Sequence, residues 1–254
     1  MAKLLLSIFA VAALSCAGAQ ASQPSAGVAD VSDGTPVAGY RFVKTGGDGR
    51  YYIDYEAMGE EARDDGHFAA LSERFIADDP ALGVEDLQVL YYGRTFRDDR
   101  EATGLTCADI EKAAEEGDYD KAYAFCLDLQ RHDPASPQLL RLLHESASKK
   151  SMPAAEPELS ALERRYRFVL DVISYSGNGT MLAPYIVVSA GDEYELMHGR
   201  LGITDIVMRQ QVGLDDGTPC DVVTVGEGEG SDSENDEVWF DISMSPRASD
   251  KLSE

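Results

Sequence analysis

The sequence predicts an α+β fold, with helices in the first part of the chain and a small, mostly antiparallel sheet in the last part. Apolar residues recur at helical spacing up to about residue 175, most clearly in one stripe formed by Leu159, Leu162, Tyr166, Val169 and Ile173. After a Gly-rich turn at 176–179 the pattern changes, and between residues 237 and 244 apolar and polar residues alternate as they do in a strand. Helices followed by strands are typical of the α+β class.

The remaining elements of the fold are marked by local start and stop signals. Aromatic residues flank a Gly-rich turn within 39–56, which predicts a hairpin. Helices are predicted at 67–77, which Asp79-Pro80 closes, and at 83–94. Beyond the long helix at 156–175, the pattern predicts strands at 185–189, 201–211 and 221–225, with a short helix around 193–198.

The segment from residue 106 to residue 150 predicts three consecutive helices. Gly117-Asp118 separates the first apolar stripe from the second, and Asp133-Pro134 separates the second from the third. Short breaks of this kind join antiparallel neighbours, so the first two helices are expected to form a hairpin. Residues 106–140 resemble a tetratricopeptide repeat, because Gly117-Asp118-Tyr119, Ala122 and Asp133-Pro134 fall where that family places its second helix and its end.

Residues 1–21 read as a secretory signal peptide, with Lys3 before an apolar run and small residues after it. The run is too short to span a membrane stably. Cleavage is expected at an A-x-A site near Ala19 or Ala21; the alternative is a lipobox that leaves Cys16 lipidated. The chain then divides into a flexible linker at 22–38, a mainly helical region at 39–175, a small β-rich region at 176–245 and a polar tail at 246–254.

The chain carries 46 acidic and 22 basic residues, a formal net charge of −24. Such acidity argues against nucleic acids and anionic lipid surfaces as partners. It permits basic partners, although solubility alone also explains it. Contact with a membrane is therefore expected only through a lipid on Cys16.

Apart from Cys16, the cysteines are Cys107, Cys126 and Cys220. Cys107 and Cys126 are equidistant from the predicted turn at 116–117, so they face each other across the hairpin. In an oxidising compartment they could form a disulfide; the alternative is two small thiols that pack as apolar groups.

The sequence favours no catalytic, metal or cofactor site. No HExxH, CxxC or G-x-S-x-G motif is present, and the Gly-rich segments lack the setting of a phosphate loop. The remaining catalytic candidates are Glu193, Glu195 and His198, which are close in sequence. Asp232, Glu234 and Asp236 alternate as in a calcium loop, but the required glycine and the closing glutamate are missing, so a solvated hairpin loop is the favoured interpretation.

Five short segments, taken in order, resemble an uncharacterised family of secreted bacterial proteins, domain of unknown function 4919. They are Tyr91-Tyr92-Gly93, Ser176-Gly177-Asn178-Gly179, 185–189, Glu193-Tyr194-Glu195-Leu196 and 238–242, so the resemblance covers roughly residues 40–245. Two places depart from the family pattern: Arg94 stands where an aromatic residue is expected, and Asp98-Asp99-Arg100 replaces an aromatic–proline segment. The resemblance implies export and fold, and it carries no activity.

These observations favour a non-catalytic module of the cell envelope, periplasmic or secreted, that binds an unidentified protein or peptide. The alternative is an exported hydrolase whose site forms only in three dimensions. A deep pocket in which a carboxylate contacts a histidine would favour the hydrolase, whereas a shallow, apolar groove on the helices would favour the binding module.

Overall fold

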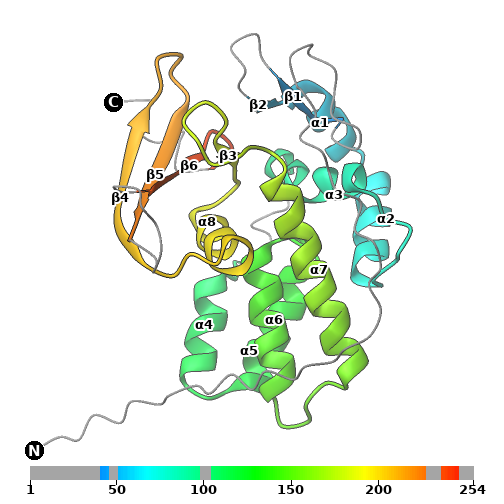
Figure 1. Cartoon of the computed structure of the whole chain (residues 1–254). Coiled ribbons are helices and arrows are strands. Elements are labelled where there is room, and N and C mark those ends of the chain that lie inside the picture. The colour runs from blue at the N-terminus through cyan, green and yellow to red at the C-terminus, as the bar shows by residue number, and fades with distance from the viewer. Residues whose placement is uncertain (1–40, 46–50, 98–103, 227–235, 246–254) are drawn as a thin grey trace, which may run out of the picture. The chain divides into compact units, whose positions relative to one another are not determined.

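The computed structural model describes residues 41–45, 51–97, 104–226 and 236–245, all of which belong to one compact unit spanning 31–254 (Figure 1). The expected signal peptide, linker and polar tail lie outside the described residues. Helices come first and a small four-stranded sheet last, which confirms the predicted α+β class. None of the helices in the described ranges is both long and apolar enough to cross a bilayer.

The first elements are a hairpin and three helices. Strands β1 (Val43–Thr45) and β2 (Tyr51–Ile53) pair antiparallel, which confirms the predicted hairpin. The helices are α1 (Tyr55–Ala62), α2 (Asp65–Ile76) and α3 (Val84–Tyr91), and a 3₁₀ turn, η1 (Gly93–Phe96), follows. Asp54 and Asp64 accept hydrogen bonds from the first turns of α1 and α2, which satisfies backbone N–H groups that have no partner within the helix.

Four helices form the next layer: α4 (Cys107–Glu115), α5 (Tyr119–Gln130), α6 (Pro137–Lys149) and α7 (Glu156–Ser174). The break between α4 and α5 falls at Gly117, whose φ of 80° is accessible to glycine at little cost. Asp118 then caps α5, and Ser136 caps α6 ahead of Pro137. Each helix packs on the next, so the predicted hairpin of two helices with a third beside it is confirmed.

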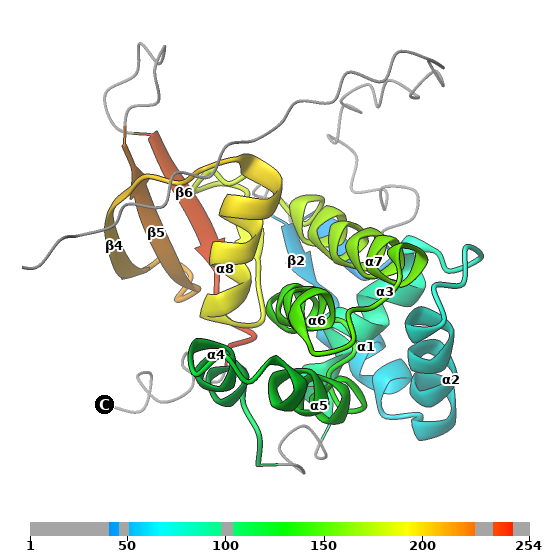
Figure 2. The same cartoon turned by 90° about the horizontal axis from the view of Figure 1, so that it is seen from below.

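The last part of the chain forms the sheet and one covering helix. Its strands are β3 (Tyr185–Ile186), β4 (Ile206–Gly213), β5 (Pro219–Val225) and β6 (Asp236–Asp241), in the order β3-β6-β5-β4. Only the β3–β6 pair is parallel, so the sheet is mostly antiparallel, as predicted. Helix α8 (Ala190–Leu196) lies between this sheet and helices α6 and α7 (Figure 2).

Several strand boundaries differ from the prediction, and the reason is clear for two of them. The strand expected at 185–189 ends at Ile186, because the chain then leaves the sheet to begin α8, which Ser189 caps. The strand expected at 201–211 starts at Ile206, because a π-helical turn, η3 (Met197–Leu201), extends the helix past His198. Apolar periodicity does not distinguish such a turn from the start of a strand.

The helices and the sheet share one hydrophobic core. Leu87 and Tyr92 from α3 and its end pack in the same cluster as Val169 from α7 and Phe240 from β6. A second cluster fills the space among α4, α5, α6 and the start of α7, and it contains Cys126. The segments that form the candidate site therefore pack against these two buried clusters.

Candidate functional site

Arg94 is buried where three distant segments of the chain meet. Its side chain is only 3% exposed. Nη1 donates to Asp133 Oδ1 at 2.6 Å, just after α5, and Nη2 donates to Asp192 Oδ2 at 2.8 Å, in the first turn of α8. The preceding Gly93 lies so close to α1 that an added Cβ would be 2.7 Å from Ala62 Cβ. Glycine therefore lets η1 approach α1 and places Arg94 against its two carboxylates.

Tyr91 completes this buried polar cluster. Its hydroxyl donates to Asp192 Oδ2 at 3.0 Å and accepts from Val188 N at 3.3 Å. The Arg94 guanidinium lies 5.0 Å from the Tyr91 ring centroid. Burial raises the pKa of Asp192, and the positive charge of Arg94 opposes that shift. Asp192 Oδ1 is buried and has no hydrogen-bond partner among the described residues.

Arg94 and Asp133 form part of the wall of a pocket of about 610 Å³, here called the α4–α8 pocket. Its wall comes from α4 and the residues before it, the end of α5, the start of α6 and the link from β3 to α8. Besides Arg94 and Asp133, the polar side chains of the wall are Thr106, Glu111, Ser136, Gln138 and Ser189. The apolar part is made by Leu105, Ala108, Leu129 and Val188.

The chemistry of this pocket suits binding more than bond breaking. Cys107 lines the pocket, but burial raises the pKa of its thiol to about 12, so it stays protonated at neutral pH and is a poor nucleophile. Both carboxylates near Arg94 are held by that guanidinium. The other polar groups of the wall are hydroxyls, the Gln138 amide and the Glu111 carboxylate. Gln138 Nε2 donates to Glu111 Oε1 at 3.1 Å.

The three residues named as catalytic candidates are not brought together. Glu193 points toward the sheet, where Arg209 Nη2 donates to its Oε1 at 2.9 Å. Glu195 points toward the helices and accepts from Arg141 Nε at 2.7 Å and from Tyr166 OH at 2.9 Å. His198 is exposed on the following turn, with its ring beside that of Tyr194. The two buried glutamates thus connect α8 to the sheet on one side and to α6 and α7 on the other.

The other candidate residues divide between the described and the remaining parts of the chain. Cys107 and Cys126 are not bridged in the structure, and both pack with the cluster among α4, α5, α6 and α7; their disulfide in an oxidising compartment stays a prediction. Asp232, Glu234 and Cys16 lie outside the described residues, and of Asp236 only the backbone, at the start of β6, is described. Within the described ranges no group of three or more His, Cys, Asp or Glu side chains is placed to hold a metal ion.

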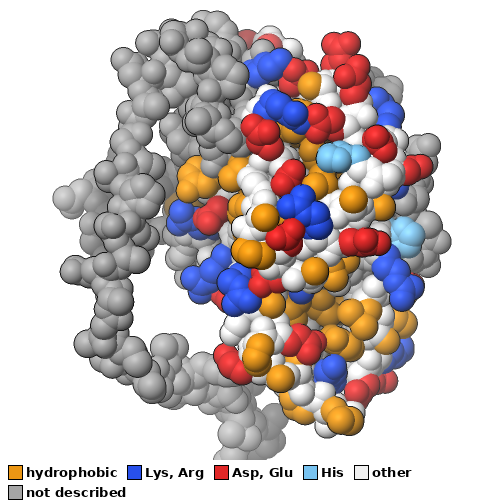
Figure 3. Space-filling view, turned by 90° about the vertical axis from the view of Figure 1, so that its right-hand side faces the viewer, with side chains coloured by type: hydrophobic (Ala, Val, Ile, Leu, Met, Phe, Trp, Pro, Cys, Tyr) orange, Lys and Arg blue, Asp and Glu red, His pale blue; other side chains and the backbone are white. Residues whose placement is uncertain are grey.

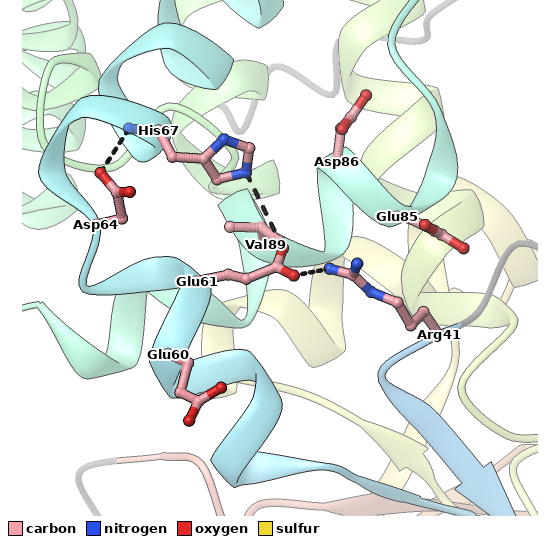
Figure 4. Close-up of a pocket in the computed structure, with 8 residues that line it drawn as sticks. All are labelled: Arg41, Glu60, Glu61, Asp64, His67, Glu85, Asp86 and Val89. Carbon is pink, nitrogen blue, oxygen red and sulfur yellow. Dashed lines mark hydrogen bonds and ion pairs between the residues drawn. The ribbon is translucent and has the colours of Figure 1, made fainter.

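A second pocket, of about 440 Å³, is lined mainly by acidic side chains from α1, from α3 and from Asp64, the N-cap of α2. Arg41 and His67 both turn toward Glu61: Arg41 forms an ion pair with it, and His67 Nε2 lies 4.0 Å from its Oε2 (Figure 4). Asp64, in the same pocket, accepts from the His67 backbone N–H. The side chains of Arg41, Glu61 and His67 are all substantially exposed, so this carboxylate–histidine contact is an open surface pair and not the deep pocket that would favour a hydrolase.

The sequence did not indicate Arg94, Asp133 and Asp192 as a set. In the sequence, Asp133 marks only the end of a helix, and no pattern singles out Asp192. One signal was available: Arg94 is the only charged residue between Leu87 and Phe96, in a stretch rich in aromatic residues. A charge there has to be buried, and a buried guanidinium requires carboxylate partners.

Comparison with known proteins gives one match. The model of the family described as domain of unknown function 4919 matches residues 58–251. No curated protein and no solved structure matches the chain. The likeness of residues 106–140 to a tetratricopeptide repeat is not confirmed by these comparisons.

Proposed function

The chain belongs to the family of domain of unknown function 4919, whose name carries no activity, and we propose that it is a non-catalytic module that binds a protein or peptide segment in the α4–α8 pocket. The observation that carries this proposal is the pocket itself, a cavity of about 610 Å³ whose wall includes Arg94, held between two carboxylates. A wall fixed in this way needs little reorganisation when a ligand binds, which favours affinity.

The side chains of the pocket wall match the needs of a short peptide. Each peptide unit brings one N–H donor and one C=O acceptor that must be satisfied when it leaves water. Thr106, Ser136 and Ser189 offer hydroxyl groups that serve as either partner, while Leu105, Leu129 and Val188 offer apolar surface. The volume falls within the range of known ligand pockets, roughly 300–1,000 Å³, so it can hold a few residues.

The charge of the pocket favours a neutral or basic segment. Glu111 and Asp133 outnumber Arg94 among the charged side chains of its wall. The whole chain carries a formal net charge of −24, which accelerates encounter with a basic partner and repels an acidic one. The hydrolase alternative has less support, since Cys107 stays protonated and Glu193, Glu195 and His198 lie apart.

Export to the cell envelope is part of the proposal and is supported by the signal-like residues 1–21. The mass of the mature N-terminus, measured on protein from the native cells, checks it. A new N-terminus near residue 20 or 22 indicates ordinary cleavage, and a lipid-modified Cys16 indicates a lipoprotein. An intact residue 1 would contradict export by this route.

A filled-pocket variant tests the binding site. Ala108 is an exposed residue of the pocket wall, so Ala108→Trp fills the pocket without entering the core. The matched control is Ala69→Trp, on an exposed position of α2 outside the pocket. Heptapeptides selected from a displayed random library on the unmodified chain should be rich in Lys and Arg and should bind Ala108→Trp at least about tenfold more weakly.

The same selection can contradict the proposal. Peptides that bind Ala108→Trp and the unmodified chain equally would place the binding site elsewhere. A selection that yields no peptide above background would remove the support for a peptide-binding module.

A further inference from the structure

A third cavity, of about 270 Å³, lies between the end of α2, the loop that follows it and the middle of α7. Figure 3 turns this side of the molecule toward the viewer and shows hydrophobic side chains lying between acidic and basic ones. The cavity has apolar walls from Phe75, Pro80, Leu82 and Phe168. Four charged side chains complete the lining: Asp78, Asp79, Arg164 and Arg165.

Arg165 is the unusual member of this lining. Its side chain is only 8% exposed, and its Nε and Nη1 atoms are buried without a hydrogen-bond partner among the described residues. Its guanidinium lies 5.8 Å from the Phe75 ring centroid. Burial lowers the pKa of Arg165, while Asp78 and Glu158 oppose that shift from a distance. A guanidinium stays charged in proteins, so a buried one without an anion is costly.

The two aspartates of the cavity do not supply that anion. Asp78 accepts from Arg164 at 2.6 Å, and Asp79 accepts from Arg74 at 2.7 Å. Each is therefore already engaged by a different arginine. Arg165 is left as the one charge of this lining without a direct partner among the described residues.

We propose that this cavity binds a single carboxylate carried on a small apolar body, with Arg165 pairing with the carboxylate and Phe75, Leu82 and Phe168 packing on the body. A guanidinium matches the planar geometry of a carboxylate. The cavity of about 270 Å³ limits the body to roughly the size of an aromatic ring. The carboxylate can belong to a small organic acid or to the C-terminus of a peptide. This inference is independent of the α4–α8 pocket.

The test uses the purified full chain and four probes that separate these sources. Phenylacetate and the tripeptide acetyl-Gly-Gly-Phe with a free C-terminus carry the carboxylate; phenylacetamide and the amidated tripeptide do not. A carboxylate probe at ten times its Kd should raise Tm by about 3–5 °C, whereas its amide should not. Arg165→Gln should weaken binding at least about tenfold, and Arg167→Gln, exposed on the same helix, should leave it unchanged.

Binding of either carboxylate probe supports the site, and which of them binds identifies the source. A second pair of variants keeps Arg165 in place: Leu82→Trp fills the cavity and should abolish binding, while Ile76→Trp, on an exposed position outside it, should not. The proposal is overturned if neither carboxylate shifts Tm, if the amides bind equally well, or if Arg165→Gln or Leu82→Trp binds like the unmodified chain.

Discussion

Arg94 and Asp192 are 98 positions apart in the sequence, yet Arg94 Nη2 donates to Asp192 Oδ2 at 2.8 Å with both side chains almost fully buried. Through this pair the turn η1, which follows α3, is bound to the start of α8, and Asp133 extends the connection to the residues after α5. One guanidinium thus joins three segments beside the α4–α8 pocket.

Removing Arg94 should strongly destabilise the fold. In Arg94→Met two carboxylates lose their partner and one of them stays buried, for which a loss of about 3–5 kcal/mol in unfolding free energy is expected. Urea denaturation of the purified chain measures it. Arg131→Met, which removes an exposed ion pair with Asp128, is the control and should change stability by less than about 0.5 kcal/mol. Equal effects of the two variants would contradict a central role of Arg94.

The stability of the protein should fall as pH rises because of Glu193. Burial raises its pKa from 4.5 to about 9, against the opposing attraction of Arg209. The folded state therefore binds a proton more tightly than the unfolded state, so its contribution is complete below pH 4.5 and is lost progressively toward pH 9. Glu193→Gln should flatten the decline of Tm between pH 5 and pH 9. Glu163→Gln, on an exposed position of α7, should leave the decline unchanged; if both variants decline like the parent, another group is responsible.

Cys107 and Cys126 should react slowly with alkylating reagents in the folded protein. Burial raises the pKa of each thiol to about 12, so at pH 7.5 the thiolate fraction is on the order of a thousandfold below that of a free cysteine with a pKa of about 8.5. Iodoacetamide labelling followed by mass mapping measures this, with urea-unfolded protein as the control. Mapping without a reductant on protein from the native compartment also tests the disulfide: masses of two free thiols would end that hypothesis.

Replacing Arg165 by an apolar residue should stabilise the ligand-free protein. Arg165→Met removes a buried charge that has no direct partner among the described residues and keeps a chain of similar length against Phe75, so a gain of about 1–3 kcal/mol is expected. Urea denaturation measures the gain, and Arg167→Met serves as the matched control. A clear loss of stability specific to Arg165→Met would mean that the charge is compensated in solution.

Most of the fold could be predicted because its signals are local. Helices α4, α5 and α6 are separated by Gly117-Asp118 and Asp133-Pro134. Gly117 forms the turn, Asp118 caps α5 and Asp133-Pro134 ends it, so each signal acts on the backbone next to it. The start of β4 was placed too early because the π-helical turn before it keeps an apolar pattern.

The candidate site could not be predicted in the same way, because its contacts are long-range. Nothing near Asp192 in the sequence indicates that Arg94 will be its partner. Acidic residues usually face solvent, so nothing local predicts that Glu193 and Glu195 are buried. They are buried because α8 is covered on two sides, by the sheet and by α6 and α7, and that arrangement depends on the whole tertiary fold.

The Arg94–Asp192 pair also bears on the order in which the chain can fold during synthesis. When the ribosome has synthesised the chain up to the end of α7, Arg94 and Asp133 are present, but Asp192 and the strands of the four-stranded sheet are not. Until then the guanidinium lacks its most deeply buried partner, and the shared core lacks the residues of β3, β5 and β6. The nascent helical part therefore remains incomplete, and the chain closes only when its last quarter arrives.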